Sequence, residues 1–413
     1  MPDPTPGARI ETTGAALIDP LVFNPYDYDF HDDPYPVYRR LREEAPLYHN
    51  PDIGFWALSR HSDVQDAFKD NTRLSSANGV SLDPAAYGPH AHLVMSFLAM
   101  DDPRHMRLRQ LVSRGFTPRR VTELSGRIHE LTIRYLEPAL ASGEFDWIAE
   151  VAGKLPMDVI SELMGVPQAD RGELRRLADL VVHREDGVLD VPQASVEASL
   201  TLMTYYKEMI AERRRSRTED MTSALLDAEI DGDKLSDQEI LGFMFLMVVA
   251  GNETTTKLLG NALYWGGHNP DQVAQVLDDP ERVSEWVEET LRYDTSSQIV
   301  ARTTAVDLEY HGVTVPAGEK MLLLMGSANR DDDVFDDADE FRIGRDSTNK
   351  LASFGGGVHF CLGAHLARLE ANIALQEFAR RVREYEVVES GIERVHSTNV
   401  RGFAALPVKV KVR

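Results

Sequence analysis

The sequence predicts one large, mainly α-helical domain with small β-sheets. Apolar residues recur three and four positions apart along most of the chain, which is the periodicity of amphipathic helices. Alternation of apolar and polar residues is confined to short stretches, as expected for minor sheets. No linker or internal repeat divides the 413 residues, and 43% of them are hydrophobic, so one large core can form. Residues 1–20 predict a disordered tail, and residues 21–413 are expected to form the domain.

The shorter elements can be placed in chain order. Helical periodicity predicts helices over Asp32–Pro46, Arg104–Ser113, Arg119–Ala141, Pro156–Met164 and Gln168–His183. Gly54–Val64 is expected to form a short strand and then the start of a helix. Arg73–Leu93 is rich in turn formers and predicts a long loop. Asp307–Leu324 predicts a small antiparallel sheet, and the C-terminal ALPVKVKV a final strand.

The clearest helix is predicted from Ser236 to about Trp265. Ser236 and Glu239 have the spacing of a capping box, and the two glycines after Trp265 are expected to end the helix. Its centre is apolar on all sides, which predicts a buried helix. Ala250–Thr254 nevertheless places a glycine, an acid and a hydroxyl in that buried stretch. Because buried polar groups are costly, this segment is expected to have a function.

The composition excludes several classes of protein. The chain has 44 basic and 67 acidic side chains, a net charge of −23, which repels nucleic acid and anionic membrane surfaces. The longest apolar run, Leu241–Gly251, is too short for a bilayer, which needs about 20 residues. The N-terminus lacks the pattern of a secretory signal. We therefore expect a cytoplasmic protein, a monomer, that binds neither nucleic acid nor membranes.

Cys361 is the only cysteine, which excludes an intramolecular disulfide and a multi-cysteine metal site. A lone cysteine is most often a small buried hydrophobic residue. Here three glycines precede it and a helical run follows it. Glycines allow a backbone to approach a bulky planar ligand, and a helix N-terminus stabilises a thiolate. The context therefore favours an axial ligand of haem iron.

The surrounding motif resembles the haem-binding signature of the cytochrome P450 family, Phe-x-x-Gly-x-(His/Arg)-x-Cys-x-Gly. It is matched by Phe354, Gly357, His359, Cys361 and Gly363. Further motifs in the expected order are Asp101–Val121, Ala250–Thr255, Glu289 with Arg292, Ser327–Asp331 and Asp339–Arg345. The resemblance runs from about Phe23 to the end and is to the soluble bacterial type. It implies a cytochrome P450 fold, one helical domain enclosing haem b, and insertion of one oxygen atom from dioxygen into an organic substrate.

Two segments depart from the family pattern. Asp332 stands where members usually have a proline. The segment after Arg292–Tyr293 usually carries a proline, and here reads Asp294-Thr295-Ser296-Ser297. These departures affect the expected loop geometry and the shape of the active site.

The resemblance implies which residues hold the haem. His105 and Arg109, four apart on one helix face, are expected to reach the propionates together with Arg302 and His359. The alternative for these residues is a solvated, arginine-rich helix. Further haem contacts are expected from Phe354, Gly355, Gly363 and Ala250.

Glu253 and Thr254 are the expected catalytic residues. Cleaving the O–O bond consumes two protons, which a hydroxyl and a nearby carboxylate can relay. The alternative is a helix kink with a satisfied polar pair. Glu289 and Arg292 are interpreted as structural, because family members lock this pair to a third basic residue, here Arg345.

The expected substrate pocket is apolar, and its lining residues are Phe97, Leu98, Leu246, Val249, Ile299, Val300 and Phe403. Such a pocket selects a lipid, terpenoid, steroid or macrolide-like skeleton. The chain has no flavin domain, iron–sulfur cysteines or dinucleotide fingerprint, so electrons must come from another protein. The segment from Pro103 to Thr122 has six arginines and no acid. Arg107, Arg114 and Arg120 are therefore predicted to dock an acidic ferredoxin.

Other functions remain open at this stage. A peroxide-driven peroxygenase, a reductase or an isomerase would use the same fold. A non-catalytic haem-binding or sensor protein would not need the Glu253–Thr254 pair. A cysteine hydrolase fits the glycine run poorly, and a haem spectrum would eliminate it.

Overall fold

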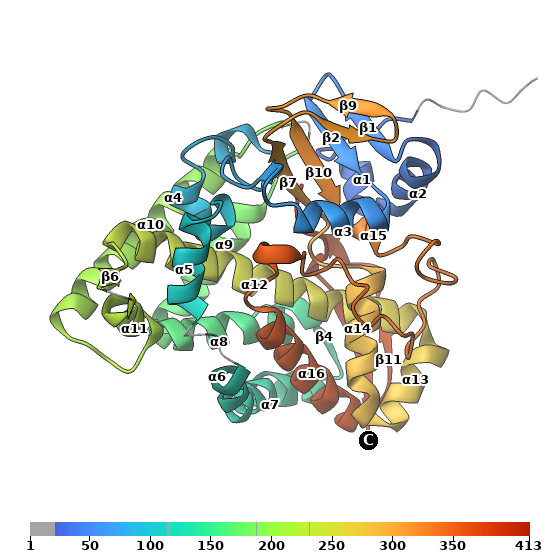
Figure 1. Cartoon of the computed structure of the whole chain (residues 1–413). Helices are drawn as coiled ribbons and strands as arrows, with labels where there is room; N and C mark the ends of the chain where they lie inside the picture. Colours follow the sequence, from blue (N-terminus) through green and yellow to red (C-terminus); the bar gives the residue numbers. More distant parts are fainter. Residues whose placement is uncertain (1–20, 114–115, 117, 187, 231) are drawn as a thin grey trace, which may run out of the picture.

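The chain folds as predicted, into a mainly helical body with small sheets at its margins (Figure 1). The computed structural model describes residues 21–113, 116, 118–186, 188–230 and 232–413, without the side chains of Ala85, Pro118 and Arg120. The tail predicted over 1–20 lies outside the described residues. None of the described helices is long and apolar enough to cross a membrane.

The α-helices are α1 (Tyr28–Asp32), α2 (Tyr35–Glu44), α3 (His61–Lys69), α4 (His92–Met95), α5 (Arg104–Ser113), α6 (Pro118–Glu123), α7 (Ser125–Ser142), α8 (Leu155–Met164), α9 (Arg171–Val182), α10 (Gln193–Arg215), α11 (Met221–Asp227), α12 (Asp237–His268), α13 (Pro270–Asp278), α14 (Val283–Tyr293), α15 (Met325–Ala328) and α16 (Ala364–Arg381). The central helix α12 crosses the body and contacts α8, α9, α10, α14 and α16. Its interior position explains why its sequence is apolar on all sides.

The largest sheet has the strand order β1 (Leu47–Asn50), β2 (Phe55–Leu58), β10 (Lys320–Leu324), β7 (Ile299–Thr304), β3 (Leu74–Ser75). It packs at one end of the body beside α2 and α3 (Figure 1). A second sheet has the order β11 (Val382–Val387), β14 (Pro407–Val412), β4 (Glu144–Asp146). The remaining strands form the pairs β5 (Glu229–Ile230) with β6 (Asp233–Lys234), β8 (Leu308–Tyr310) with β9 (Val313–Val315), and β12 (Glu393–Arg394) with β13 (Phe403–Ala405).

The predicted capping box of α12 is confirmed. The backbone N–H of Glu239 donates to Ser236 Oγ at 3.3 Å, and that of Ser236 donates to Glu239 Oε2 at 2.9 Å. The predicted end at Trp265 is wrong, because α12 continues to His268. A Cβ on Gly266 would lie 2.8 Å from the Trp286 ring. This glycine therefore permits close packing against α14 and does not end the helix.

Three further boundaries differ from the predictions. The helix expected over Arg119–Ala141 is divided into α6 and α7. The loop expected over Arg73–Leu93 contains β3 and the 3₁₀ turn Pro84–Ala86, and runs into α4. Within Asp307–Leu324, where a small antiparallel sheet was expected, only β8 and β9 pair with each other. The third strand of this segment, β10, joins the five-stranded sheet. β3 and β10 depend on partners that are distant in the sequence, because β3 pairs with β7 and β10 pairs with β2.

Candidate active site

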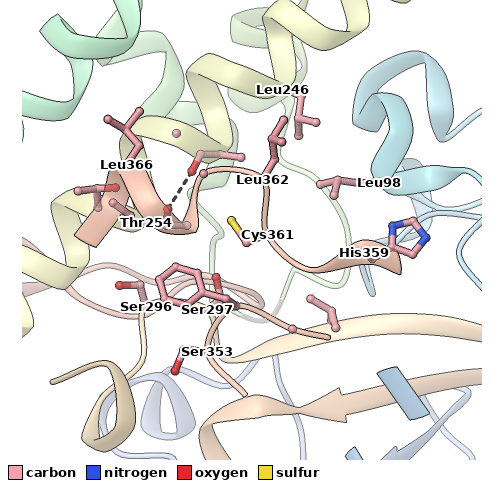
Figure 2. Close-up of a pocket in the computed structure, with 18 of the residues that line it drawn as sticks. Leu98, Leu246, Thr254, Ser296, Ser297, Ser353, His359, Cys361, Leu362 and Leu366 are labelled. Atoms are coloured by element: carbon pink, nitrogen blue, oxygen red, sulfur yellow. Dashed lines mark hydrogen bonds between the residues drawn. The ribbon is translucent and has the colours of Figure 1, made fainter. Parts of the chain in front are cut away.

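One cavity brings together most of the residues predicted to hold a haem (Figure 2). It is bounded by α5, α12, β7 and the loop before α16. The predicted residues that line it are Phe97, Leu98, Arg109, Leu246, Ala250, Thr254, Val300, Arg302, Phe354, Gly355, His359, Cys361 and Gly363. Most of the other lining side chains are apolar, among them Phe116, Ile160 and Leu366.

Cys361 lies in the loop that leads into α16. Its backbone N–H donates to Phe354 O at 2.9 Å, which holds the loop closed. The thiol is exposed to the cavity but deep within the protein, and this burial raises its pKa. This effect of burial is opposed by groups that lower the pKa of the thiol, among them the backbone N–H groups of Gly363 and Ala364 and the Arg109 guanidinium. The predicted placement at a helix N-terminus is confirmed, and these groups stabilise a thiolate.

Two of the three glycines before Cys361 pack against α3. Gly357 has φ +59°, and a Cβ there would clash with the carbonyl oxygen of Phe68. A Cβ on Gly356 would lie 3.1 Å from Phe68 Cβ. These two glycines therefore allow the loop to pack closely against α3, whereas Gly355 lines the cavity, and the approach of the loop to a planar ligand stays a prediction.

Four basic side chains lie together at one side of the cavity: His105, Arg109, Arg302 and His359. The rings of His105 and His359 are in contact, with centroids 4.1 Å apart and planes tilted by 42°. Burial, together with the charges of Arg302, His105 and Arg109, lowers the pKa of His359 to about 3. Burial also lowers the pKa of Arg302 to about 10. Arg302 therefore stays charged at neutral pH whereas the His359 ring is neutral, and the positive charge of this part of the cavity comes from its guanidinium groups.

Several buried nitrogen atoms of this group have no hydrogen-bond partner among the described residues. They are His105 Nε2, Arg109 Nη1 and His359 Nδ1. Buried polar atoms without partners are rare in folded proteins, and the positive charge of the Arg109 guanidinium favours an anionic group beside them. Two propionates meet that requirement, and Cys361 offers the axial ligand. The residues present therefore fit a haem.

Strand β7 supplies one wall of the cavity and explains one wrong prediction. Successive side chains of a strand point to opposite faces. Val300 and Arg302 point into the cavity, whereas Ile299 and Ala301 join a core cluster with Phe23. Ile299 therefore does not line the substrate pocket.

Two other expected pocket residues are also wrong. Phe403 is 0% exposed and lies in the core, 4.7 Å from the Tyr264 ring and 4.1 Å from the Arg394 guanidinium. Val249 is half-buried against the helical core and does not line the cavity. On a fully buried helix, apolar composition does not distinguish the face that borders a cavity.

Thr254 and Glu253 lie on different sides of α12. Thr254 borders the cavity that contains Cys361, and its hydroxyl donates to Ala250 O at 2.8 Å (Figure 2). Glu253 is 1% exposed and borders a second, charged cavity. The expected acid and hydroxyl therefore do not form one contact pair, and α12 separates their side chains.

Glu253 is held by groups that the sequence reasoning missed. Lys257 Nζ lies 3.1 Å from Glu253 Oε2, and Asn252 donates to Glu253 Oε1 at 3.1 Å. Burial would raise the pKa of Glu253, but the charge of Lys257 and the hydrogen bonds to Asp179 and Lys257 together lower it. The pKa of Asp179, which is exposed to the second cavity, is raised by the surrounding protein and by Glu253. The i, i+4 spacing of Glu253 and Lys257 was the available sequence signal.

Glu370 is a further group that was missed. It lines the cavity from α16, is 2% exposed, and its Oε2 has no partner among the described residues. Burial raises its pKa to about 8, so this carboxyl is largely protonated at neutral pH. The sequence carried no signal beyond a glutamate within a helical run.

The predicted structural triad forms. Glu289 and Arg292 make two hydrogen bonds of 2.8 and 2.9 Å, and both side chains are almost completely buried. Arg345 Nε lies 3.5 Å from Glu289 Oε2. Arg292 also donates to the carbonyl oxygens of Asn329, Ala338 and Glu340. The triad thus joins α14 to the segment that precedes the Cys361 loop.

The predicted docking arginines are only partly described. Arg107 forms ion pairs with Asp233 and Glu239, so its charge is already neutralised and it does not form the expected free positive patch. Arg114 lies outside the described residues, as does the side chain of Arg120. Phe360, the residue before Cys361, is 45% exposed.

The fold and this cavity define a haem-thiolate protein. The family model described as Cytochrome P450 matches residues 192–412, more than half of the chain. The chain belongs to the cytochrome P450 family, whose members are haem-thiolate monooxygenases.

Individual relatives agree with this assignment. The chain is 62% identical over 393 residues to the putative cytochrome P450 123 of Mycobacterium tuberculosis, covering 95% of this chain and 98% of that protein. It is 38% identical to the vitamin D(3) 25-hydroxylase of Pseudonocardia autotrophica, covering 93% and 95%. The structure of CYP109E1 from Bacillus megaterium in complex with testosterone matches with a TM-score of 0.85 and 30% identity, covering 92% and 98%.

Proposed function

We propose that this enzyme inserts one oxygen atom from dioxygen into an apolar organic substrate, with haem b held by Cys361 and electrons supplied by a ferredoxin and its reductase. One observation carries the proposal. Cys361 and Thr254 border the same mainly apolar cavity. The buried nitrogen atoms of His105, Arg109 and His359 that have no hydrogen-bond partner among the described residues lie at one side of it. This arrangement matches what dioxygen chemistry on a haem-thiolate needs.

Each residue of the cavity has a distinct task in this proposal. Haem b bound through a thiolate supplies dioxygen activation and O–O cleavage. Cys361 provides the thiolate, and Arg109, Arg302, His105 and His359 bind the propionates. The apolar walls exclude water and bind the hydrocarbon skeleton of the substrate.

The substrate is proposed to be an apolar skeleton of the lipid, terpenoid, steroid or macrolide-like class. The relatives named above act on vitamin D(3) or bind testosterone, both of which are large and mainly apolar. The aromatic and aliphatic side chains that line the cavity, such as Phe97, Leu98 and Leu246, suit such a skeleton.

Protons are proposed to reach the cavity by way of α12. Asp179 and Glu253 border the second cavity, whereas Thr254, the next residue, borders the cavity of Cys361, so a proton must pass around α12 from one cavity to the other. Asp179 holds a proton more readily than an ordinary aspartate because the protein and Glu253 raise its pKa. Movement of the Thr254 hydroxyl away from Ala250 O allows it to donate a proton within the cavity.

Thr254→Ala is expected to uncouple turnover. Substrate binding and reductant consumption continue, but product per electron pair falls by about tenfold or more, since general acid catalysis contributes on this scale. Peroxide released per molecule of reductant should rise in parallel. Thr254→Ser keeps the hydroxyl and should remain coupled. Full coupling in the alanine variant would contradict the role of Thr254.

Electron transfer is proposed to occur at the surface around Phe360, near the cysteine ligand. α6, which carries Arg119 and Arg120, contacts α16. The Arg119 side chain is 89% exposed and forms an exposed ion pair with Glu123 at 3.0 Å, which contributes little and leaves the arginine accessible to a partner. The net charge of −23 makes such a local basic surface selective for an acidic partner. Arg107 has no role in this revised surface because two carboxylates neutralise it.

Charge reversal by Arg120→Glu is expected to slow ferredoxin-supported reduction several-fold while leaving substrate affinity unchanged, because complementary charge mainly governs association rates. Added salt should slow the wild type and affect the variant little. Arg176→Glu, a reversal of an exposed arginine on α9, is the control and should not change the rate. If reduction is insensitive to both salt and Arg120→Glu, the partner binds elsewhere.

A further inference from the structure

Two serines interrupt the apolar lining of the cavity. Ser296 and Ser297 lie in the segment between α14 and β7 and border the cavity side by side (Figure 2). The preceding residue, Thr295, also lines the cavity. This is the segment in which the sequence departs from the proline-containing family pattern.

The Ser296 hydroxyl is unsatisfied. The residue is 5% exposed, and its Oγ has no hydrogen-bond partner among the described residues. A buried hydroxyl without a partner is destabilising, so such groups are rare unless a ligand supplies the missing hydrogen bond. Ser353, another serine of the cavity, differs because its hydroxyl donates to Leu291 O at 2.7 Å.

The backbone around the two serines is fixed. The Arg401 N–H donates to Ser296 O at 2.8 Å, and Ser297 forms a β-bridge with Val400. The next residue, Gln298, donates its backbone N–H to Asn399 O at 2.8 Å. The hydroxyls therefore occupy defined positions on the wall, as recognition of one ligand atom requires.

The charged residues of the cavity indicate whether the two serines would bind a charged or a neutral oxygen of a ligand. Its described guanidinium groups, Arg109 and Arg302, lie in the electropositive region assigned to the propionates. No further lysine or arginine borders the cavity among the described residues. A substrate carboxylate would lack a cation of its own, whereas a neutral hydroxyl or carbonyl oxygen needs only hydrogen-bonding partners.

We propose that Ser296 and Ser297 bind a neutral hydroxyl or carbonyl oxygen of the substrate. This rests on the proposed function and narrows the substrate class to apolar skeletons that already carry one such oxygen. Fixing that oxygen on the wall also fixes which carbon lies nearest the reaction centre, so the serines determine the position of oxidation.

Three probes of equal chain length test the proposal on the haem-loaded enzyme: dodecane, dodecan-1-ol and dodecanoic acid. Binding is measured by the spin-state change of the haem spectrum and by calorimetry. The wild type should bind the alcohol about three- to tenfold more tightly than the alkane, the worth of one or two hydrogen bonds. Ser296→Ala combined with Ser297→Ala should abolish this preference and leave alkane affinity unchanged.

Val300→Ala is the matched control, because it removes apolar atoms from the same wall. It should weaken the alcohol and the alkane equally and preserve their ratio. An alcohol-to-alkane ratio that is near one in the wild type, or that survives the double substitution, overturns the proposal. Tightest binding of the acid, or no response to the alcohol, overturns it too. A normal thiolate spectrum and activity on another substrate would show that the proposed function stands without it.

Discussion

Cys361→Ala is expected to abolish the red-shifted Soret band that the ferrous enzyme gives with carbon monoxide, together with all monooxygenase activity. The thiolate supplies the electron density that produces this band and favours O–O cleavage. Cys361 is the only cysteine of the chain, so no other thiolate can replace it. The optical spectrum of the reduced, carbon monoxide-treated protein measures the effect directly.

The structure offers a control for this substitution. Val300→Ala removes atoms from the same cavity but no ligand, and should keep the band at full intensity. Arg109, Arg302, His105 and His359 are unchanged in both variants. These propionate-binding residues should therefore keep some haem bound to Cys361→Ala. A red-shifted band in Cys361→Ala would show that the ligand is another residue.

Glu289→Gln is expected to cost about 3–5 kcal/mol of folding free energy. It would leave the Arg292 guanidinium, which is 0% exposed, without its carboxylate, and Arg345 would lose its partner 3.5 Å away. A loss of this size approaches the whole stability of a typical domain, which is about 5–15 kcal/mol. Urea unfolding followed by circular dichroism should show the loss, and the soluble yield and haem content should fall with it.

Glu285→Gln is the matched control on the same helix. Its carboxylate pairs with Arg282, and both side chains are about one third exposed. Exposed ion pairs contribute about 0–1 kcal/mol, so this variant should unfold almost as the wild type does. Equal stability of Glu289→Gln and Glu285→Gln would contradict the structural role of the triad.

Elements defined by local pattern were predictable from the sequence. The helix Arg104–Ser113 has the predicted boundaries, and the Ser236 capping box forms as its spacing required. Two of the boundaries that failed depend on distant partners. Gly266 continues α12 because Trp286 packs against it, and β10 finds its neighbours β2 and β7 far away in the sequence. Local periodicity carries no information about such contacts.

The active site, like the fold, has features that the sequence predicted and features that it could not predict. The motif around Cys361 located the loop that carries the ligand and His359, because these residues are adjacent in sequence. His105, Arg109 and Arg302 lie far from the motif and were expected from the family resemblance. Side-chain direction was not predictable. Ile299 and Val300 are adjacent and both are apolar and β-branched, yet only Val300 faces the cavity. Glu253 and Thr254 are adjacent too, and they border different cavities across α12.

The most direct test of the proposed monooxygenase activity follows the oxygen atom. The haem-loaded enzyme, supplied with ferredoxin, reductase and an apolar alcohol, is allowed to react under dioxygen labelled with a heavy oxygen isotope. Mass spectrometry of the product should find one labelled atom in each newly oxidised molecule, with none taken from the solvent. Product that carries oxygen from water, or substrate that leaves chemically unchanged while dioxygen is consumed, would contradict the function proposed for this chain.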